Sequence, residues 1–183
     1  MKRYIAFLRG INLGKRRLAM SRLKDLFVEL GYEEVETFIA SGNVLFSTAE
    51  PDAAALENEI AAHLQASLGY EVDTFIRTPQ DVIKIGRAKL FPEQDDDDVT
   101  VHVSFLHEKL PTATVKKLTA IRTETDAFRV VGREFFWRCR GRMSDSTVWS
   151  LPEAKALKLP TSTMRSMKSL RKLIAKHFDG RDA

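Results

Sequence analysis

Short apolar segments and longer amphipathic segments alternate along the first half of the chain. The short ones are rich in β-branched and aromatic residues, as strands are, and cover residues 2–8, 35–39, 43–47 and 72–77. Between them, apolar residues three and four positions apart predict two helices with the stripes Leu23, Leu26, Phe27 and Leu30, and Leu56, Ile60, Leu64 and Leu68. Ser21 is a candidate N-cap, and Gly31 and Gly69 are suited to end the helices. This strand–helix–strand–strand–helix–strand order is that of a ferredoxin-like unit.

The second half of the chain begins with the same order of elements, without a detectable sequence repeat. Residues 99–105 alternate between apolar and polar, as expected of a strand with one buried face. Pro111 opens a short helix, and Gly132 and Arg133 separate two strand-like segments as in a two-residue hairpin. The remainder is mostly helical in pattern. A fourth strand is not evident, and residues 147–151 are only a weak candidate for it, so we expect an incomplete or atypical second unit.

A short helix and an acidic linker are expected between the two halves. Thr78 and Pro79 form a helix start, with a capping hydroxyl followed by proline at the first helical position. Residues 95–98 are consecutive aspartates, which repel one another and resist packing. We therefore expect an α+β protein with antiparallel sheets, made of two tandem ferredoxin-like units. The first would comprise residues 1–92, and the second, which ends in a basic helix, would comprise residues 97–183.

The composition is that of an ordinary globular protein. Hydrophobic residues make up 44% and charged residues 30% of the chain, which is enough apolar side chain to build a core. No apolar run approaches the roughly 20 residues that cross a bilayer, and the N-terminal apolar stretch is too short for a signal peptide. Cys139, expected as a small core residue, is the only cysteine, and His102 and His107 lack a metal-ligand spacing. We expect a cytoplasmic protein without a metal, a cofactor or a membrane partner.

The net charge of +4 conceals a strong asymmetry. Residues 1–24 carry eight Lys or Arg and no acid, and residues 129–183 carry thirteen against five acids. Residues 25–128 carry eight bases and twenty acids. Local charge of this size either steers an anionic partner toward the basic ends or is neutralised internally when the chain folds.

The first candidate site is the loop after the first strand, Arg9-Gly10-Ile11-Asn12-Leu13-Gly14-Lys15. It resembles a phosphate-binding loop, but it has three residues between its glycines instead of four, and Arg16 follows the lysine, so hydrolysis at a Walker-type site is not expected. Glycines expose backbone N–H groups, and a nearby anion is favoured by the cations Arg9, Lys15, Arg16 and Arg17. The alternative is a tight strand-to-helix connection with solvated bases.

The second candidate is the turn Ser41-Gly42-Asn43 between the second and third strands. In a ferredoxin-like unit the first and third strands are antiparallel neighbours, so this turn and the glycine loop should meet at one edge of the sheet. Short polar side chains, glycines and bases would then converge as a small binding site requires. The candidate ligand-binding residues are Arg9, Gly10, Asn12, Gly14, Lys15, Ser41, Gly42 and Asn43. Arg9 is the leading anion contact, and the competing role for it is an ion pair with a carboxylate of the acidic middle segment.

These same residues resemble a known family. The segments YIAFLRGINLGK, ELGY and TFIASGNVLF are similar to the bacterial family called domain of unknown function 1697. The resemblance continues through Arg77 and Thr78, residues 99–106, and the Thr163-Met164-Arg165 segment. It implies a pair of ferredoxin-like subdomains and brings no established activity, substrate or cofactor. The family pattern near the C-terminus has Asn and Thr where this chain has Ser166 and Ser169.

The basic C-terminal third is a further candidate surface. Alternate positions of one strand and the polar side of the last helix supply the bases Arg138, Arg140, Arg142, Lys168, Arg171 and Lys172. Aromatic residues next to such bases are typical of nucleic-acid surfaces, although a solvated basic face has the same pattern.

Three functions follow as hypotheses, because no catalytic constellation stands out. The leading one is a binding protein for a small anionic ligand, bearing phosphate or carboxylate, at the loop and turn. The second is nucleic-acid binding by the basic C-terminal face. The third is an enzyme that acts on a phosphorylated small molecule at the loop and turn. The sequence leaves the ligand, any reaction and the oligomeric state open.

Overall fold

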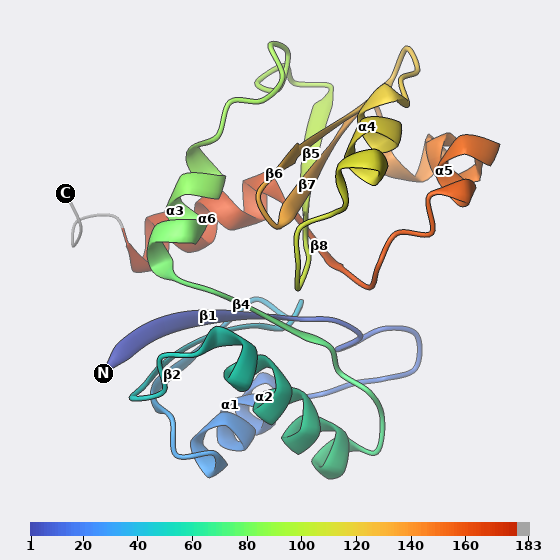
Figure 1. Ribbon diagram of the computed structural model, residues 1–183. Helices are drawn as coiled ribbons and strands as arrows, with labels where there is room; N and C mark the ends of the chain where they lie inside the picture. Colours follow the sequence, from blue (N-terminus) through green and yellow to red (C-terminus); the bar gives the residue numbers. More distant parts are fainter. Residues whose placement is uncertain (179–183) are drawn as a thin grey trace. The chain divides into compact units, whose positions relative to one another are not determined.

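Each half of the chain forms its own four-stranded antiparallel sheet (Figure 1). The computed structural model describes residues 1–178 and divides into two units, Met1–Ile83 and Lys84–Ala183. This architecture confirms the α+β class and the tandem ferredoxin-like arrangement. The division falls before the four aspartates at residues 95–98, which therefore lie within the second unit. In the described part of the chain, no helix combines the length and apolar character needed to cross a membrane.

The first unit has the strand order β2-β3-β1-β4, so β1 pairs with both β3 and β4. Its elements are β1 (Lys2–Leu8), α1 (Met20–Glu29), β2 (Glu33–Phe38), β3 (Asn43–Thr48), α2 (Ala53–Leu68) and β4 (Thr74–Arg77). Both helices cover the same face of the sheet (Figure 1). The predicted apolar stripes of the helices, including Leu23, Phe27, Ile60 and Leu64, form one core with alternate strand residues such as Phe46.

The ends of the helices follow local capping rules. Asp52 caps α2 by accepting a hydrogen bond from the backbone N–H of Ala54 at 2.9 Å, and Gly69 ends that helix in the left-handed region, as the sequence predicts. The predicted N-cap Ser21 is wrong. The helix α1 begins one residue earlier, at Met20, and its cap Ala19 supplies no side-chain bond, so apolar packing places this helix end.

The second sheet has the equivalent strand order, β6-β7-β5-β8. The remaining elements are α3 (Pro79–Arg87), which spans the division, β5 (Val99–Phe105), α4 (Thr112–Ala120), β6 (Asp126–Val131), β7 (Glu134–Arg140), two 3-10 turns η1 (Met143–Asp145) and η2 (Val148–Ser150), α5 (Pro152–Ala156), β8 (Thr163–Ser166) and α6 (Met167–His177). Leu118 of α4 and Ala154 of α5 pack on one face of this sheet. On α3, a Cβ at Gly86 would clash with Cδ1 of Ile174 on α6, so a larger residue there would require the Ile174 side chain to move.

The fourth strand of the second unit is β8, and the weak candidate at residues 147–151 is wrong. That segment forms the 3-10 turn η2, in which Val148 is fully buried. The adjacent Trp149 packs edge-on against Trp137, with ring centroids 5.6 Å apart, and against Phe128 at 5.2 Å. Its apolar residues therefore fill the core beside the sheet without joining it. The second sheet is complete, and the unit is atypical because short turns and the five-residue α5 replace a long second helix.

Asp126, at the start of β6, is a buried acceptor for four hydrogen bonds. Its Oδ1 accepts from Trp137 Nε1 at 2.7 Å and from the Ser146 hydroxyl at 2.8 Å. Its Oδ2 accepts from the hydroxyls of Thr125 at 2.6 Å and Thr123 at 2.9 Å. Burial by itself raises the pKa of this carboxyl, but the hydrogen bonds together outweigh burial and hold the pKa of Asp126 below its ordinary value.

We expect the second unit to lose stability in acid through this network. A carboxyl whose pKa is lower in the folded state stabilises fully above its ordinary pKa of 3.8, and the contribution is lost as pH falls through the lower folded-state pKa. Asp126→Asn should reduce the unfolding free energy at neutral pH by about 1–3 kcal/mol and flatten its acid dependence. Unfolding is followed by fluorescence, since both tryptophans, Trp137 and Trp149, lie in this unit. If the unfolding free energy of the wild type and of Asp126→Asn fell equally with pH, Asp126 would not be the source of the acid dependence.

Candidate functional site

The pairing of β1 with β3 brings the two candidate loops together. Phe7 lies opposite Asn43 in the register, and the backbone N–H of Leu8 donates to the carbonyl of Gly42 at 2.8 Å. This confirms the prediction that the glycine loop and the turn share one edge of the sheet. We call residues 9–17 together with residues 39–43 the N-terminal rim.

Asn12 joins the two halves of this rim. Its Oδ1 accepts from the backbone N–H of Leu18 at 2.6 Å, and its Nδ2 donates to the carbonyls of Ala40 at 3.1 Å and Leu18 at 3.4 Å. Its φ of +55° is in the left-handed region, which asparagine tolerates better than most residues. The amide that the sequence offers as a ligand donor is thus engaged in holding the loop against the turn.

The polar residues of the turn are also engaged within it. Asn43 is 2% exposed, and its Nδ2 donates to the carbonyl of Phe38 at 3.0 Å and to the hydroxyl of Ser41 at 2.9 Å. Gly42 has a φ of +80°, and a Cβ there would lie 3.1 Å from Cβ of Leu8. These contacts build the turn and leave its apolar Ile39 exposed.

The cations of the rim are exposed and differ in their contacts. Arg9 Nη1 lies 3.5 Å from Oδ2 of Asp73, which gives the competing ion-pair role a partner, although both side chains are more than a third exposed. Arg17 donates to the carbonyl of Gly14 at 2.9 Å. Lys15 is exposed, and within the described residues the structure gives it no ion pair.

Arg16 spans the rim toward the segment that precedes β4. Its guanidinium lies 4.1 Å from the centroid of the Tyr70 ring, and its Nη1 donates to the carbonyl of Gly10 at 3.3 Å. Gly10 and Gly14 both have positive φ, so the chain reverses direction around this side chain. Arg16 therefore fills the space between the glycine loop and the segment before β4.

The basic surface of the second unit is partly neutralised by the acidic segment, residues 93–98. Arg138 contacts Glu93, with Nη2 and Oε1 3.1 Å apart. Arg140 contacts Asp98 at 2.6 Å and Asp96 at 3.0 Å. A longer contact of 3.7 Å joins Arg171 to Asp95. The aspartates expected to form a solvated linker therefore pair with two of the six proposed nucleic-acid residues, and Glu93 pairs with a third. The exposed bases left over are Arg142, Lys168 and Lys172.

The reactive side chains elsewhere lie in structural settings. Cys139 is fully buried, as the sequence predicts, and burial raises the pKa of its thiol. Burial lowers the pKa of His102, whose Nδ1 has no hydrogen-bond partner. His63 contacts Glu29 at 3.1 Å on the first unit's helices. Across residues 1–178 no group of three His, Cys, Asp or Glu side chains is placed to hold a metal ion.

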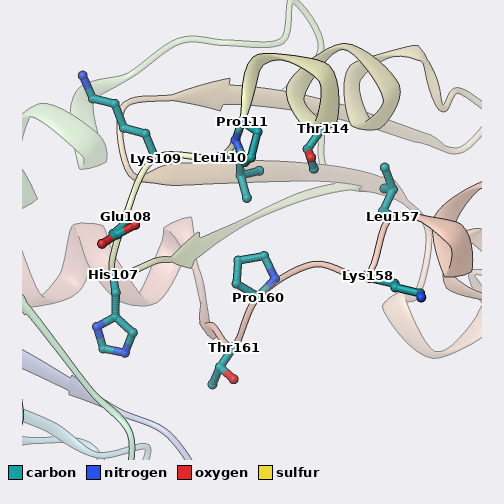
Figure 2. Close-up of a pocket in the computed structure, with 10 residues that line it drawn as sticks. All are labelled: His107, Glu108, Lys109, Leu110, Pro111, Thr114, Leu157, Lys158, Pro160 and Thr161. Atoms are coloured by element: carbon teal, nitrogen blue, oxygen red, sulfur yellow. The ribbon is translucent and has the colours of Figure 1, made fainter.

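A groove of about 550 Å³ in the second unit is a site that the sequence pattern did not indicate (Figure 2). It lies between the loop after β5 and the segment before β8, and its lining residues are His107, Glu108, Lys109, Leu110, Pro111, Thr114, Leu157, Lys158, Pro160 and Thr161. Its only unusual sequence signal is the pair of prolines Pro111 and Pro160, 49 positions apart, because a groove between loops leaves no periodic pattern.

This α+β protein consists of two ferredoxin-like units in tandem. In each unit, loops meet at one edge of the sheet, where the strands end. The family model described as protein of unknown function (DUF1697) matches residues 1–136, and the chain belongs to this family, which confirms the resemblance. The solved structure of a conserved bacterial protein, SP0830 from Streptococcus pneumoniae, has a TM-score of 0.72 at 22% identity and covers 94% of this chain and 96% of that chain. At this identity the likeness concerns the fold alone. A comparison with curated proteins finds no match.

Substitution of Gly42 should destabilise the first unit more than substitution of another left-handed glycine. Gly42→Ala should lower the free energy of unfolding for two reasons. The positive φ costs about 1–2 kcal/mol, and the close contact with Leu8 brings the total to about 2–4 kcal/mol. Gly69→Ala is the control, because Gly69 has a φ of +77° and nothing within 4 Å of an added Cβ. Hydrogen exchange of the β1 and β3 amides measures the difference. Equal losses for the two variants would show that the close approach carries no cost.

Neutralising two aspartates of the acidic segment should weaken its attachment to β7. Asp96→Asn with Asp98→Asn removes both carboxylates that contact Arg140, so we expect a small decrease in melting temperature that shrinks as salt is added. Asp97→Asn is the matched control, since Asp97 has no ion pair among residues 1–178. If the control lowers the melting temperature as much per charge as the double variant, the pairs contribute nothing specific.

Proposed function

We propose that the chain binds a small anionic ligand, bearing a phosphate or carboxylate group, at the N-terminal rim. The observation that carries the proposal is a set of exposed cations on a loop whose position is fixed by side-chain hydrogen bonds. Those cations are Arg9, Lys15, Arg16 and Arg17. A fixed loop loses little conformational freedom on binding, so more of the interaction energy appears as affinity.

The charges of the rim are unbalanced. Asp73 is the carboxylate that the structure pairs with these cations, and its contact with Arg9 is long and solvent-exposed. Four cations against one such carboxylate leave a local positive field that attracts anions, and the field acts over about 8 Å, the Debye length at physiological salt. Lys15 and Arg17 are the best placed to contact a ligand. Arg16 is held against Tyr70, whereas Arg17 bonds to the carbonyls of Gly14 and Arg16 through the single nitrogen Nη1.

Some residues of the candidate site shape it and others contact the ligand. Asn12 and Asn43 position the loop and the turn, since their amides bond to the chain itself. Gly42 allows the close approach of the two loops. In this proposal the ligand is recognised by cationic side chains and by free backbone N–H groups of the loop, and the asparagines act through the shape they impose.

The two other hypotheses have less support. Nucleic-acid binding would use a face on which Arg138, Arg140 and Arg171 already contact carboxylates. An enzyme at the rim would need a general acid, a base or a nucleophile beside the ligand, and no feature of the loop or the turn supplies a specific indication of one. Anion binding needs only the charges that are present.

Removal of two rim charges should weaken anion binding about tenfold or more, as expected for the loss of two charge-assisted contacts. The variant is Lys15→Gln with Arg17→Gln, and the probes are inorganic phosphate, citrate and glucose 6-phosphate, measured by calorimetry at low salt. Lys2→Gln with Lys24→Gln is the control, because it removes the same charge from the same unit outside the rim. Equal affinity in the two variants, or no binding of any probe to the wild type, would overturn the proposal.

A further inference from the structure

The groove of the second unit corresponds in the first unit to the space between the glycine loop of the N-terminal rim and the segment before β4. Phe7 on β1 pairs with Asn43 on β3 and with Phe75 on β4. Phe105 on β5 pairs in the same way with Glu134 on β7 and with Thr163 on β8. The loop after β5 therefore corresponds to the glycine loop after β1, and the segment before β8 corresponds to the segment before β4.

The two units differ in what occupies the space between these two segments. In the first unit Arg16 fills it, with its guanidinium stacked on Tyr70 and bonded to the carbonyl of Gly10. In the second unit the corresponding space is the groove of about 550 Å³. This volume is within the range of about 300–1,000 Å³ that small-molecule sites occupy. The same position in the fold is therefore occupied by a side chain in the first unit and is an open groove in the second.

From this difference we infer that the groove is a second binding site, which takes a small organic anion with an apolar body about the size of an aromatic ring. The walls are apolar and face one another: Leu110 and Pro111 form one side, and Leu157 and Pro160 form the other (Figure 2). The proline rings are rigid, so ordering a ligand between them costs little side-chain entropy. A flat apolar group is complementary to apolar walls of this kind.

Polar groups at the edges of the groove select the charge of the ligand. The side chain of Thr114 extends from α4 toward the space between the walls and supplies a hydroxyl to the lining (Figure 2). Lys109 and Lys158 stand at the two ends with their side chains directed outward, against the single carboxylate of Glu108 (Figure 2). The groove also borders the start of α4, where no side chain caps the first turn and no acid lies in it. The two lysines act on a ligand through their field and not by contact, and together with the start of α4 they outweigh Glu108 and favour an anionic group on the ligand.

Lys158 shows that this wall is held in an unfavourable backbone conformation. Its φ is +46°, in the left-handed region that lysine rarely adopts. Such a conformation persists only where surrounding contacts impose it. Leu157 and Leu159, on either side of it, pack against the second unit's core and provide those contacts. The wall is therefore pre-formed, which favours binding.

The test uses the full chain and a panel of aryl carboxylates and an aryl phosphate: benzoate, phenylacetate, indole-3-acetate and phenyl phosphate. Backbone amide shifts in NMR titrations give the dissociation constants and locate binding. We expect shifts in the loop after β5 and before β8, and binding at least about fivefold weaker for the neutral amides of the same compounds. The carboxylate and phosphate arms identify the acidic group preferred.

Two variants separate this site from a non-specific effect. Thr114→Phe places a ring into the groove and should weaken binding at least about tenfold. Ala113→Phe adds the same ring to the neighbouring exposed position of α4, outside the groove lining, and should leave the affinity within about twofold. Melting temperatures and amide spectra show whether each variant is folded. If Thr114→Phe unfolds the unit, Pro160→Gly, which removes one wall, replaces it with the same expected loss.

Several results would overturn the inference. They are an absence of binding at millimolar probe, equal affinity for acids and neutral amides, or equal effects of Thr114→Phe and Ala113→Phe. The inference does not depend on the proposed function of the N-terminal rim. Lys15→Gln with Arg17→Gln should leave aryl acid binding unchanged, so either site can fail while the other stands.

Discussion

The antiparallel pairing of the first strand of each unit with the third is the constraint on which the rest of the structure depends. In β1 and β3 it sets Phe7 opposite Asn43, and in β5 and β7 it sets Phe105 opposite Glu134. The end of one strand therefore lies beside the start of another that is some thirty residues away. Loops distant in sequence meet at this edge in both units, and both proposed ligand sites lie there.

The elements were predictable where the hydrophobic pattern reflects burial on one face. The stripes on α1 and α2 and the alternation in β5 are of this kind, since each side chain meets the core directly. The strand β8 could not be found in this way. It has four residues, and Arg165 lies among them at a buried position, so neither length nor alternation marks it. Its place is decided by pairing with β5, which no local pattern contains.

The candidate site was predictable in position and not in the roles of its side chains. Topology alone placed the glycine loop beside the turn. It could not show that Asn12 and Asn43 direct their amides to backbone carbonyls, because that depends on rotamers set by neighbours. The pairing of Arg140 with Asp96 and Asp98 joins residues more than forty positions apart. Whether the acidic middle of the chain neutralises the basic ends depends on such pairs, and only the three-dimensional structure shows them.

The single buried thiol has a practical consequence. Cys139 is fully buried near the end of β7, the strand between β5 and β6, and the chain has no other cysteine. A thiol reagent can reach it only when the second sheet opens, so the labelling rate under native conditions reports the opening of that unit alone. Labelling of Cys139 therefore measures the opening of the second unit, and the same assay gives no signal for the first unit.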